Sequence, residues 1–251
     1  MTTSTLTPLM AFARRRSGAS LPGPARTSAW SPLAGAEERH VELFGGSQDC
    51  AGPAFALALE SHRATPGDER PWLWVQDCAA LRLTGRPYRP GLPRALRHRL
   101  IHVATTTPED ALFALEEGLR CRDLAFVVGE IAGNPRALSF TAQRRLSLVA
   151  EKHGVPLWLV RLGAGRDLSS ARQRWTLRPA PSLPPRWNVQ APGTAAWHAE
   201  LFRARNHPPG EWILRDDGDF LTAAQPHQSQ NDSAHPVDLA GAAGDRPLAA
   251  G

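Results

Sequence analysis

Between residues 37 and 220, short apolar runs alternate with longer segments in which apolar residues recur every three or four positions. The short runs predict strands. They lie at 40–44, 71–77, 100–104, 124–128 and 155–162. The longer segments predict amphipathic helices at 53–63, 107–121 and 139–153. Strands that alternate with helices in this way are typical of a parallel α/β sheet.

Local signals support the ends of two helices. Thr107 can cap the second helix, Pro108 suits its first turn, and Glu109 faces the positive end of the helix dipole. Gly154 stands where a helix commonly ends in a left-handed residue. Three further strands are expected without intervening helices, at 172–178, 197–205 and 211–215. We therefore expect a mostly parallel sheet flanked by helices, with antiparallel strands near the C-terminus.

Two flanking segments lack the apolar residues that a packed core requires. Residues 1–36 are rich in Ser, Thr, Pro and Ala, and residues 221–251 contain few large aliphatic side chains. Neither segment can bury enough apolar surface to offset the entropy lost on ordering. We expect a disordered N-terminal arm (1–36), a single α/β domain (37–220) and a disordered C-terminal tail (221–251).

The segment after the first predicted strand has the position of a phosphate-binding loop, G-x-x-x-x-G-K-[ST]. With the motif started at Gly45, Cys50 stands at the second glycine, Ala51 at the lysine and Gly52 at the hydroxyl residue. A start one residue later also lacks the lysine and the hydroxyl. The chemistry that neutralises the β- and γ-phosphates and holds Mg²⁺ is therefore missing in either register.

Two further residues of the loop argue against phosphate binding. Asp49 adds a negative charge, and Pro53 has no N–H to offer to an anion. We therefore predict a degenerate loop that binds no nucleotide and needs no cofactor. Its glycines are Gly45, Gly46 and Gly52.

Two acids are the remaining candidates for catalytic chemistry. Glu130 follows the predicted strand 124–128, and Asp77 ends the strand 71–77. Acids in such positions hold magnesium in phosphate-loop enzymes, but polar residues are also ordinary at the carboxyl edge of a sheet. Without the loop lysine we favour the structural interpretation. We expect no catalytic residue and no metal site, and we predict that the chain is not an enzyme.

The basic residues are almost all arginine. The formal charge is +5, and Lys152 is the only lysine. Residues 78–108 contain six arginines and no acid, and residues 161–205 contain eight arginines and two acids. Such stretches suit DNA or an acidic protein, and equally suit solvated arginines whose stems cover the core. The candidate contact residues are Arg14, Arg15 and Arg16 in the N-terminal arm and Arg144 and Arg145 in the third helix.

With these segments placed, the chain resembles the ImuA family of inducible mutagenesis proteins over about residues 40–217. The resemblance rests on the order and spacing of several short segments rather than on one motif. These are HVELFG (40–45), YRPGL (88–92), PEDAL (108–112), LEEGLR (115–120), VVGE (127–130), TAQRRLSL (141–148), Arg161, SARQRW (170–175), LFRAR (201–205), Glu211 and Trp212.

The resemblance implies a RecA-like fold of the degenerate phosphate-loop NTPase type. It also implies a place in the SOS response to DNA damage, in error-prone translesion synthesis. The implied partners are an ImuB-type protein, which is an inactive relative of Y-family polymerases, and an error-prone replicative-type DNA polymerase. RecA and DNA itself stay open as further partners. The family supplies no catalytic residue.

Three classes of function follow. The first is a non-catalytic adaptor in a translesion complex, which we favour. The second is a weak or atypical NTPase in which Glu130, Asp77 and an arginine replace the usual machinery, and the third is a module that binds single-stranded DNA. No apolar run approaches the roughly 20 residues that span a bilayer, and no signal peptide is recognisable. We therefore expect a cytoplasmic protein without membrane contact.

Overall fold

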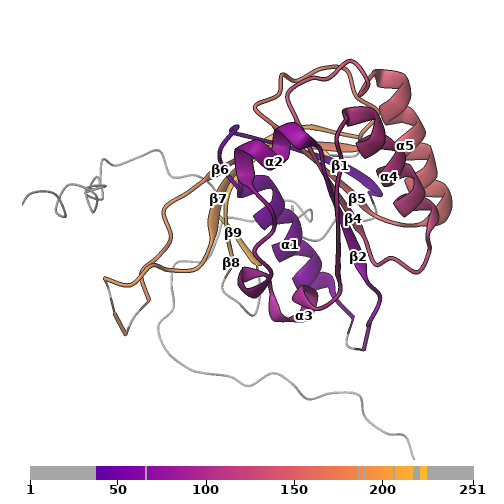
Figure 1. Cartoon of the computed structure of the whole chain (residues 1–251). Coiled ribbons are helices and arrows are strands. Elements are labelled where there is room, and N and C mark those ends of the chain that lie inside the picture. The colour runs from indigo at the N-terminus through magenta and orange to yellow at the C-terminus, as the bar shows by residue number, and fades with distance from the viewer. Residues whose placement is uncertain are drawn as a thin grey trace, which may run out of the picture. The chain divides into compact units, whose positions relative to one another are not determined.

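The computed structural model describes residues 38–65, 67–185, 187–188, 190–205, 207–216 and 221–224. Within these residues nine strands form one sheet (Figure 1). They are β1 (His40–Gly45), β2 (Trp72–Gln76), β3 (Leu100–Ala104), β4 (Val127–Ala132), β5 (Leu157–Leu162), β6 (Gln173–Pro179), β7 (Ala196–Ala204), β8 (Gly210–Asp216) and β9 (Leu221–Ala224). Their order is β3-β2-β4-β5-β1-β6-β7-β8-β9.

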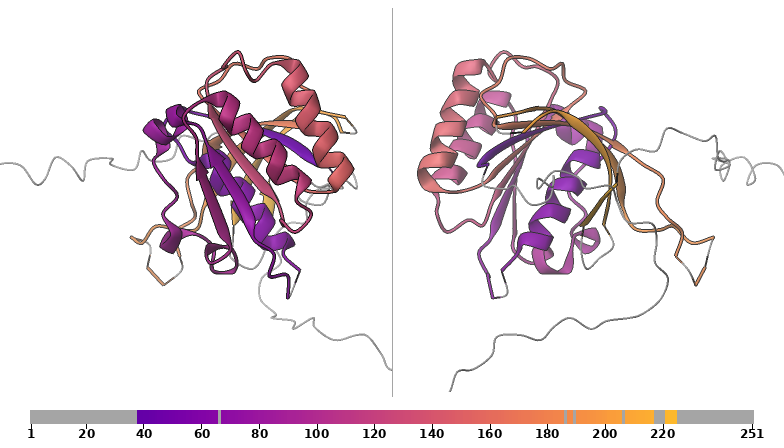
Figure 2. Two further views of the ribbon diagram at one scale, coloured as in Figure 1. Left: turned by 45° about the vertical axis from the view of Figure 1, so that its right-hand side comes forward. Right: turned by 180° about the vertical axis from the view of Figure 1, so that it is seen from behind.

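The sheet is parallel from β3 to β6 and antiparallel from β6 to β9. This confirms the predicted α/β class, its mostly parallel sheet and its antiparallel C-terminal strands. The antiparallel part curves around the first helix, α1 (Ala51–Arg63) (Figure 2). β1 lies inside the sheet between β5 and β6, so the loop that follows it opens at the carboxyl edge of the parallel strands. Ligands bind at this edge in open α/β sheets.

Helices cover both faces of the sheet. They are α1, α2 (Cys78–Thr84), α3 (Arg94–Arg97), α4 (Pro108–Arg120) and α5 (Phe140–His153), with a 3₁₀ turn at Arg89–Gly91. α4 and α5 pack side by side on one face, and α1 and α2 lie on the other (Figure 1). The α4 face buries aliphatic residues such as Leu115 and Leu119 against Val75 and Leu159 of the strands.

The predicted helix ends are confirmed by their hydrogen bonds. The Thr107 side chain accepts a hydrogen bond from the Asp110 amide at the start of α4. The Ser139 side chain accepts one from the Ala142 amide at the start of α5, and Gly154 ends α5 in the left-handed conformation. These caps satisfy amides that have no partner inside the helix.

The predicted bounds of the fourth strand were wrong. β4 spans Val127–Ala132 rather than 124–128, so Glu130 lies inside the strand instead of beyond it. Gly129, which lies beyond the predicted strand, is a strand residue with a packing role. A Cβ atom there would lie 2.8 Å from both Leu115 methyl groups of α4. The position therefore needs a residue without a side chain so that α4 can approach the sheet.

Other differences from the sequence analysis are local. The short helices α2 and α3 were not predicted, and β9 extends the sheet to Ala224, beyond the domain boundary expected at residue 220. The arm 1–36 and residues 225–251 of the predicted tail lie outside the described residues. Within the described part of the chain, no helix is both long enough and apolar enough to cross a membrane.

Candidate functional site

The loop between β1 and α1 is occupied by a carboxylate of its own. The Gly46 amide donates a hydrogen bond to Oδ2 of Asp49 at 2.7 Å, and the Ala51 amide donates one to Oδ1 at 3.0 Å. Amides at this position, after a central strand and at the start of a helix, are the groups that bind phosphate in nucleotide-binding loops. Here both amides are satisfied by Asp49, so a phosphate would have to displace a negative charge that is covalently tethered beside them.

The loop needs glycine at three positions, because a side chain there would collide with Asp49 or with a neighbouring strand. A Cβ atom on Gly46 would lie 2.5 Å from Oδ2 of Asp49, and one on Gly45 would lie 3.0 Å from Oδ1. A Cβ atom on Gly52 would lie 2.9 Å from Cγ1 of Val160, so this glycine lets α1 pack against β5. The three glycines of the degenerate motif therefore make room for Asp49 and for the packing of α1.

Glu130, the first acid considered for catalysis, is fully buried and saturated with donors. Oε2 accepts hydrogen bonds from Nε1 of Trp74 at 3.0 Å and from Nε2 of Gln76 at 2.8 Å. Oε1 accepts one from the Thr84 hydroxyl at 2.7 Å. Burial raises the pKa of Glu130, which the three donors partly offset. The carboxyl group ties β4 to β2 and to the end of α2.

Asp77, the second candidate acid, is the N-cap of α2. Its side chain accepts a hydrogen bond from the Ala80 amide at 2.6 Å. Burial raises its pKa against the effect of that bond. Asp77 and Glu130 lie at the same edge of the sheet, where the Asp77 amide donates to the Glu130 carbonyl at 3.2 Å. The structure thus gives each of the two side chains internal partners.

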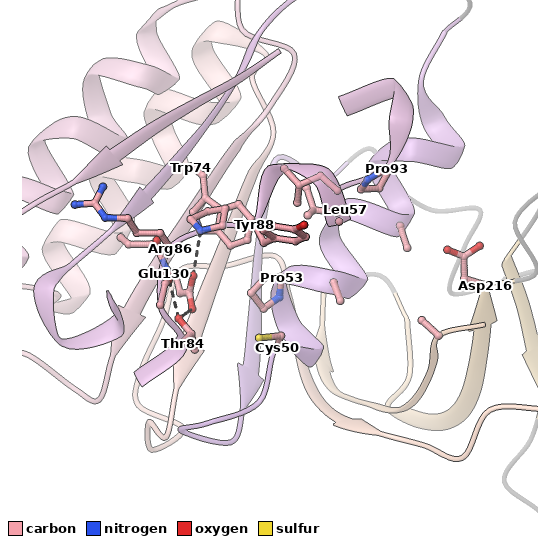
Figure 3. Close-up of a pocket in the computed structure, with 18 of the residues that line it drawn as sticks. Cys50, Pro53, Leu57, Trp74, Thr84, Arg86, Tyr88, Pro93, Glu130 and Asp216 are labelled. Atoms are coloured by element: carbon pink, nitrogen blue, oxygen red, sulfur yellow. Dashed lines mark hydrogen bonds between the residues drawn. The ribbon is translucent and has the colours of Figure 1, made fainter. Parts of the chain in front are cut away.

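A mostly apolar pocket of about 430 Å³ lies beside the loop, between α1 and the segment that follows α2 (Figure 3). Cys50 and Pro53 line it at the start of α1, and Tyr88 lines it from the opposite side. Glu130 forms part of the wall together with its partner Thr84. The pKa of the exposed Cys50 thiol is raised by partial desolvation and by nearby carboxylates, so the thiol is protonated at neutral pH and is a poor nucleophile. The pocket suits apolar groups better than phosphates.

Behind the loop, a buried carboxylate holds two buried arginines. Oε1 of Glu42 accepts from Nη1 of Arg161 at 3.2 Å, and Oε2 accepts from Nε of Arg174 at 2.6 Å. Both guanidinium groups also lie near the Phe44 ring, with centroid distances of 5.6 and 5.1 Å. The sequence analysis counted these arginines within a basic stretch, but they join β1, β5 and β6 inside the protein and offer no charge to DNA.

The candidate contact residues fall into three groups. Arg14, Arg15 and Arg16 lie outside the described residues. Nε of Arg145 lies 2.5 Å from Oε2 of Glu116, so this arginine joins α5 to α4. Arg144 is exposed and lines a groove that also contains arginines from β7 and from the end of that strand. The structure therefore separates the two neighbouring arginines of α5: Arg145 has a structural partner, whereas Arg144 faces solvent.

Sequence reasoning noticed Asp49 as an unfavourable charge but missed its hydrogen bonds. It also missed Glu42, Arg161 and Arg174 as a buried group. A signal for this group was present, because Glu42 lies in the middle of a mostly apolar strand, where a buried acid needs a cation or hydrogen-bond donors as partners. The partner could not be named from sequence, because β5 and β6 follow β1 by more than 100 residues.

Taken together, the fold and the site define an α/β protein with a phosphate-type loop that is closed by its own side chain. No protein-family model matches the chain. The chain is 36% identical over 135 residues to Protein ImuA from each of two strains of Caulobacter vibrioides, a match that covers 50% of this chain and 52% of each relative. The resemblance to the ImuA family is thus confirmed over this part. The chain spans about half the length of the curated relatives it matches.

Proposed function

We propose that this protein is a non-catalytic accessory protein of a damage-inducible, error-prone translesion DNA synthesis complex. In this proposal it acts in the cytoplasm, binds an ImuB-type polymerase-like protein and works beside a replicative-type polymerase. The similarity to proteins named ImuA supports the biological setting. The proposed fold is a RecA-like one that has lost its nucleotide. The central place of β1, followed directly by a glycine-bearing loop and α1, supports that origin.

The observation that carries the adaptor role is the Asp49 carboxylate in the loop. Nucleotide-driven proteins change shape because the γ-phosphate and its Mg²⁺ hold mobile loops in place. In this chain the two amides already have an acceptor in the Asp49 side chain. Asp49 therefore stabilises the loop without a ligand, which supports a surface around it that binds a partner without a nucleotide.

The partner experiment uses size-exclusion chromatography of the full chain with its cognate ImuB-type protein, without nucleotide. We expect one complex that elutes identically after addition of ATP and Mg²⁺. Separate peaks that join only with ATP and Mg²⁺ would show a surviving nucleotide switch, and the NTPase alternative would replace the proposal. Separate peaks under both conditions would contradict the adaptor role.

A further inference from the structure

A groove of about 500 Å³ runs between α5 and the end of β7, on the side of the sheet opposite α1. One stripe of α5 forms its first wall, with Phe140, Arg144 and Leu148 spaced four residues apart on one side of the helix. Arg203 and Arg205 form the second wall. The floor is the segment before β6, which includes Ser169 and Ser170.

The groove carries an excess of positive charge. Four arginines and one carboxylate line it, namely Arg144, Arg172, Arg203, Arg205 and Glu151. The carboxylate is already engaged, because Nη2 of Arg172 lies 2.5 Å from Oε1 of Glu151. Glu38 lies close enough to Arg172 and Arg205 to interact electrostatically with both. Among the described residues, Arg144 and Arg203 have no carboxylate within ion-pair distance.

Exposed apolar side chains lie between these charges. Phe140 is 46% exposed and Leu148 is 53% exposed, although both belong to a helix whose other face is buried. An apolar stripe that alternates with unpaired cations is costly to leave in water and gains most when a surface of matching pattern covers it.

We propose that this groove is the docking site of the protein partner, and that the docked segment is an acidic stretch with interspersed aliphatic or aromatic side chains. The carboxylates of such a segment would pair with Arg144 and Arg203, and its apolar side chains would cover Phe140 and Leu148. This inference rests on the proposed adaptor function and names the chemistry of its partner.

A protein segment fits the groove better than single-stranded DNA. Nucleic-acid grooves combine phosphate-binding cations with several aromatic platforms for the bases. Of the aromatic side chains, Phe140 alone lines the groove in the described part of the chain, and the other large apolar residue in its lining is aliphatic. Leu148 offers no stacking surface, whereas it can be buried by an apolar side chain of a peptide.

The test compares charge-reversal variants of the full chain for binding to the cognate ImuB-type protein by biolayer interferometry. In the Arg144→Glu, Arg203→Glu double variant we expect the affinity to fall at least tenfold. Arg82→Glu serves as the matched control, because Arg82 is exposed on α2, on the other face of the sheet, and should leave the affinity unchanged. Urea unfolding midpoints of all proteins establish that the variants are folded.

The outcomes separate the two proposals. If the wild-type chain does not bind the partner, the adaptor function itself is contradicted. If the wild-type chain binds and the double variant binds equally well, the groove assignment alone is overturned. A fluorescent oligo(dT) is tested in parallel. Loss of oligonucleotide binding in the double variant, with partner binding intact, would assign the groove to nucleic acid and overturn the inference. Rescue of the double variant by lysine substitutions in an acidic segment of the partner would support it directly.

Discussion

The carboxylate of Asp49 lies 2.7 Å from the Gly46 amide nitrogen, in a loop whose position in the fold belongs to a bound phosphate in nucleotide-binding proteins. The same carboxylate reaches the first amide of α1. The negative charge that a bound phosphate would bring to these amides thus comes from a side chain of the loop itself. The arrangement explains how a loop in this position can keep its shape without the lysine of a phosphate-binding loop.

Replacement of Asp49 tests whether this carboxylate stabilises the loop. Asp49→Ala leaves two amides without their acceptor, and we expect the free energy of unfolding to fall by about 1 kcal/mol, since the site is partly exposed. Asp49→Asn should lose less, because its amide oxygen can still accept one bond. Urea denaturation measures both, with Gln48→Ala, an exposed neighbour in the same loop, as control. Equal stability of Asp49→Ala and wild type would contradict the assignment.

The second prediction concerns the pH dependence that the buried carboxyl group of Glu130 gives to stability. Burial raises its pKa above 4.5, so the folded state keeps a proton that the unfolded chain releases. The contribution of Glu130 to the free energy of unfolding therefore falls as the pH rises from 4.5 through the pKa of the folded state. Glu130→Gln does not titrate; its amide oxygen can still accept from Trp74, and its amide nitrogen can donate to the Thr84 hydroxyl. We expect the variant to gain stability relative to wild type as the pH rises over that window. Urea titrations between pH 4 and 8 measure the difference, and a variant that loses stability at pH 8 would contradict this view.

For His40 we expect the stability of the fold to depend on pH in the opposite direction. It is completely buried, with Nδ1 2.6 Å from the Ser147 hydroxyl, and burial lowers its pKa from 6.5 to about 4. The unfolded chain therefore binds a proton between pH 6.5 and 4 that the folded chain excludes. This costs up to about 3 kcal/mol of stability as the pH falls through that window. In His40→Gln the acid-dependent loss over this range should be correspondingly smaller. If thermal or urea unfolding shows that His40→Gln loses as much stability as the wild type between pH 6.5 and 4, the prediction is contradicted.

The buried cluster of Glu42, Arg161 and Arg174 is expected to be among the groups most sensitive to substitution. Glu42→Ala would leave the buried guanidinium groups of Arg161 and Arg174 without their carboxylate, at a cost of about 3–5 kcal/mol. The control is Glu117→Ala on the exposed pair with Arg120, which should cost less than about 1 kcal/mol. Chemical denaturation compares the two. Similar effects of both variants would show that the buried group contributes little.

The order of strands and helices could be predicted because the buried parallel strands and the amphipathic helices leave strong local patterns. Thr107, Ser139 and Gly154 carry their capping roles in their own residue types. β4 was misplaced for a physical reason. Gly129 and Glu130 are unusual in a buried strand, and they are tolerated only because α4 packs over the glycine and three donors surround the acid.

The chemistry of the loop was predicted in part. The missing lysine and hydroxyl are visible in the sequence, whereas the hydrogen bonds of Asp49 depend on how the backbone turns between Gly46 and Ala51. In the basic stretches, too, the sequence does not show which arginines are paired with acids. Arg166 and Arg172 pair with Glu200 and Glu151, and only the fold reveals which cations stay available at the surface.

The central claim is that the closed loop leaves no place for a nucleotide, and a titration of MgATP into the purified full chain tests it most directly. Isothermal titration calorimetry at millimolar ATP should give no saturable heat for the wild-type chain. Saturable binding with a micromolar Kd, weakened by Glu130→Gln, would contradict the account and restore the NTPase alternative.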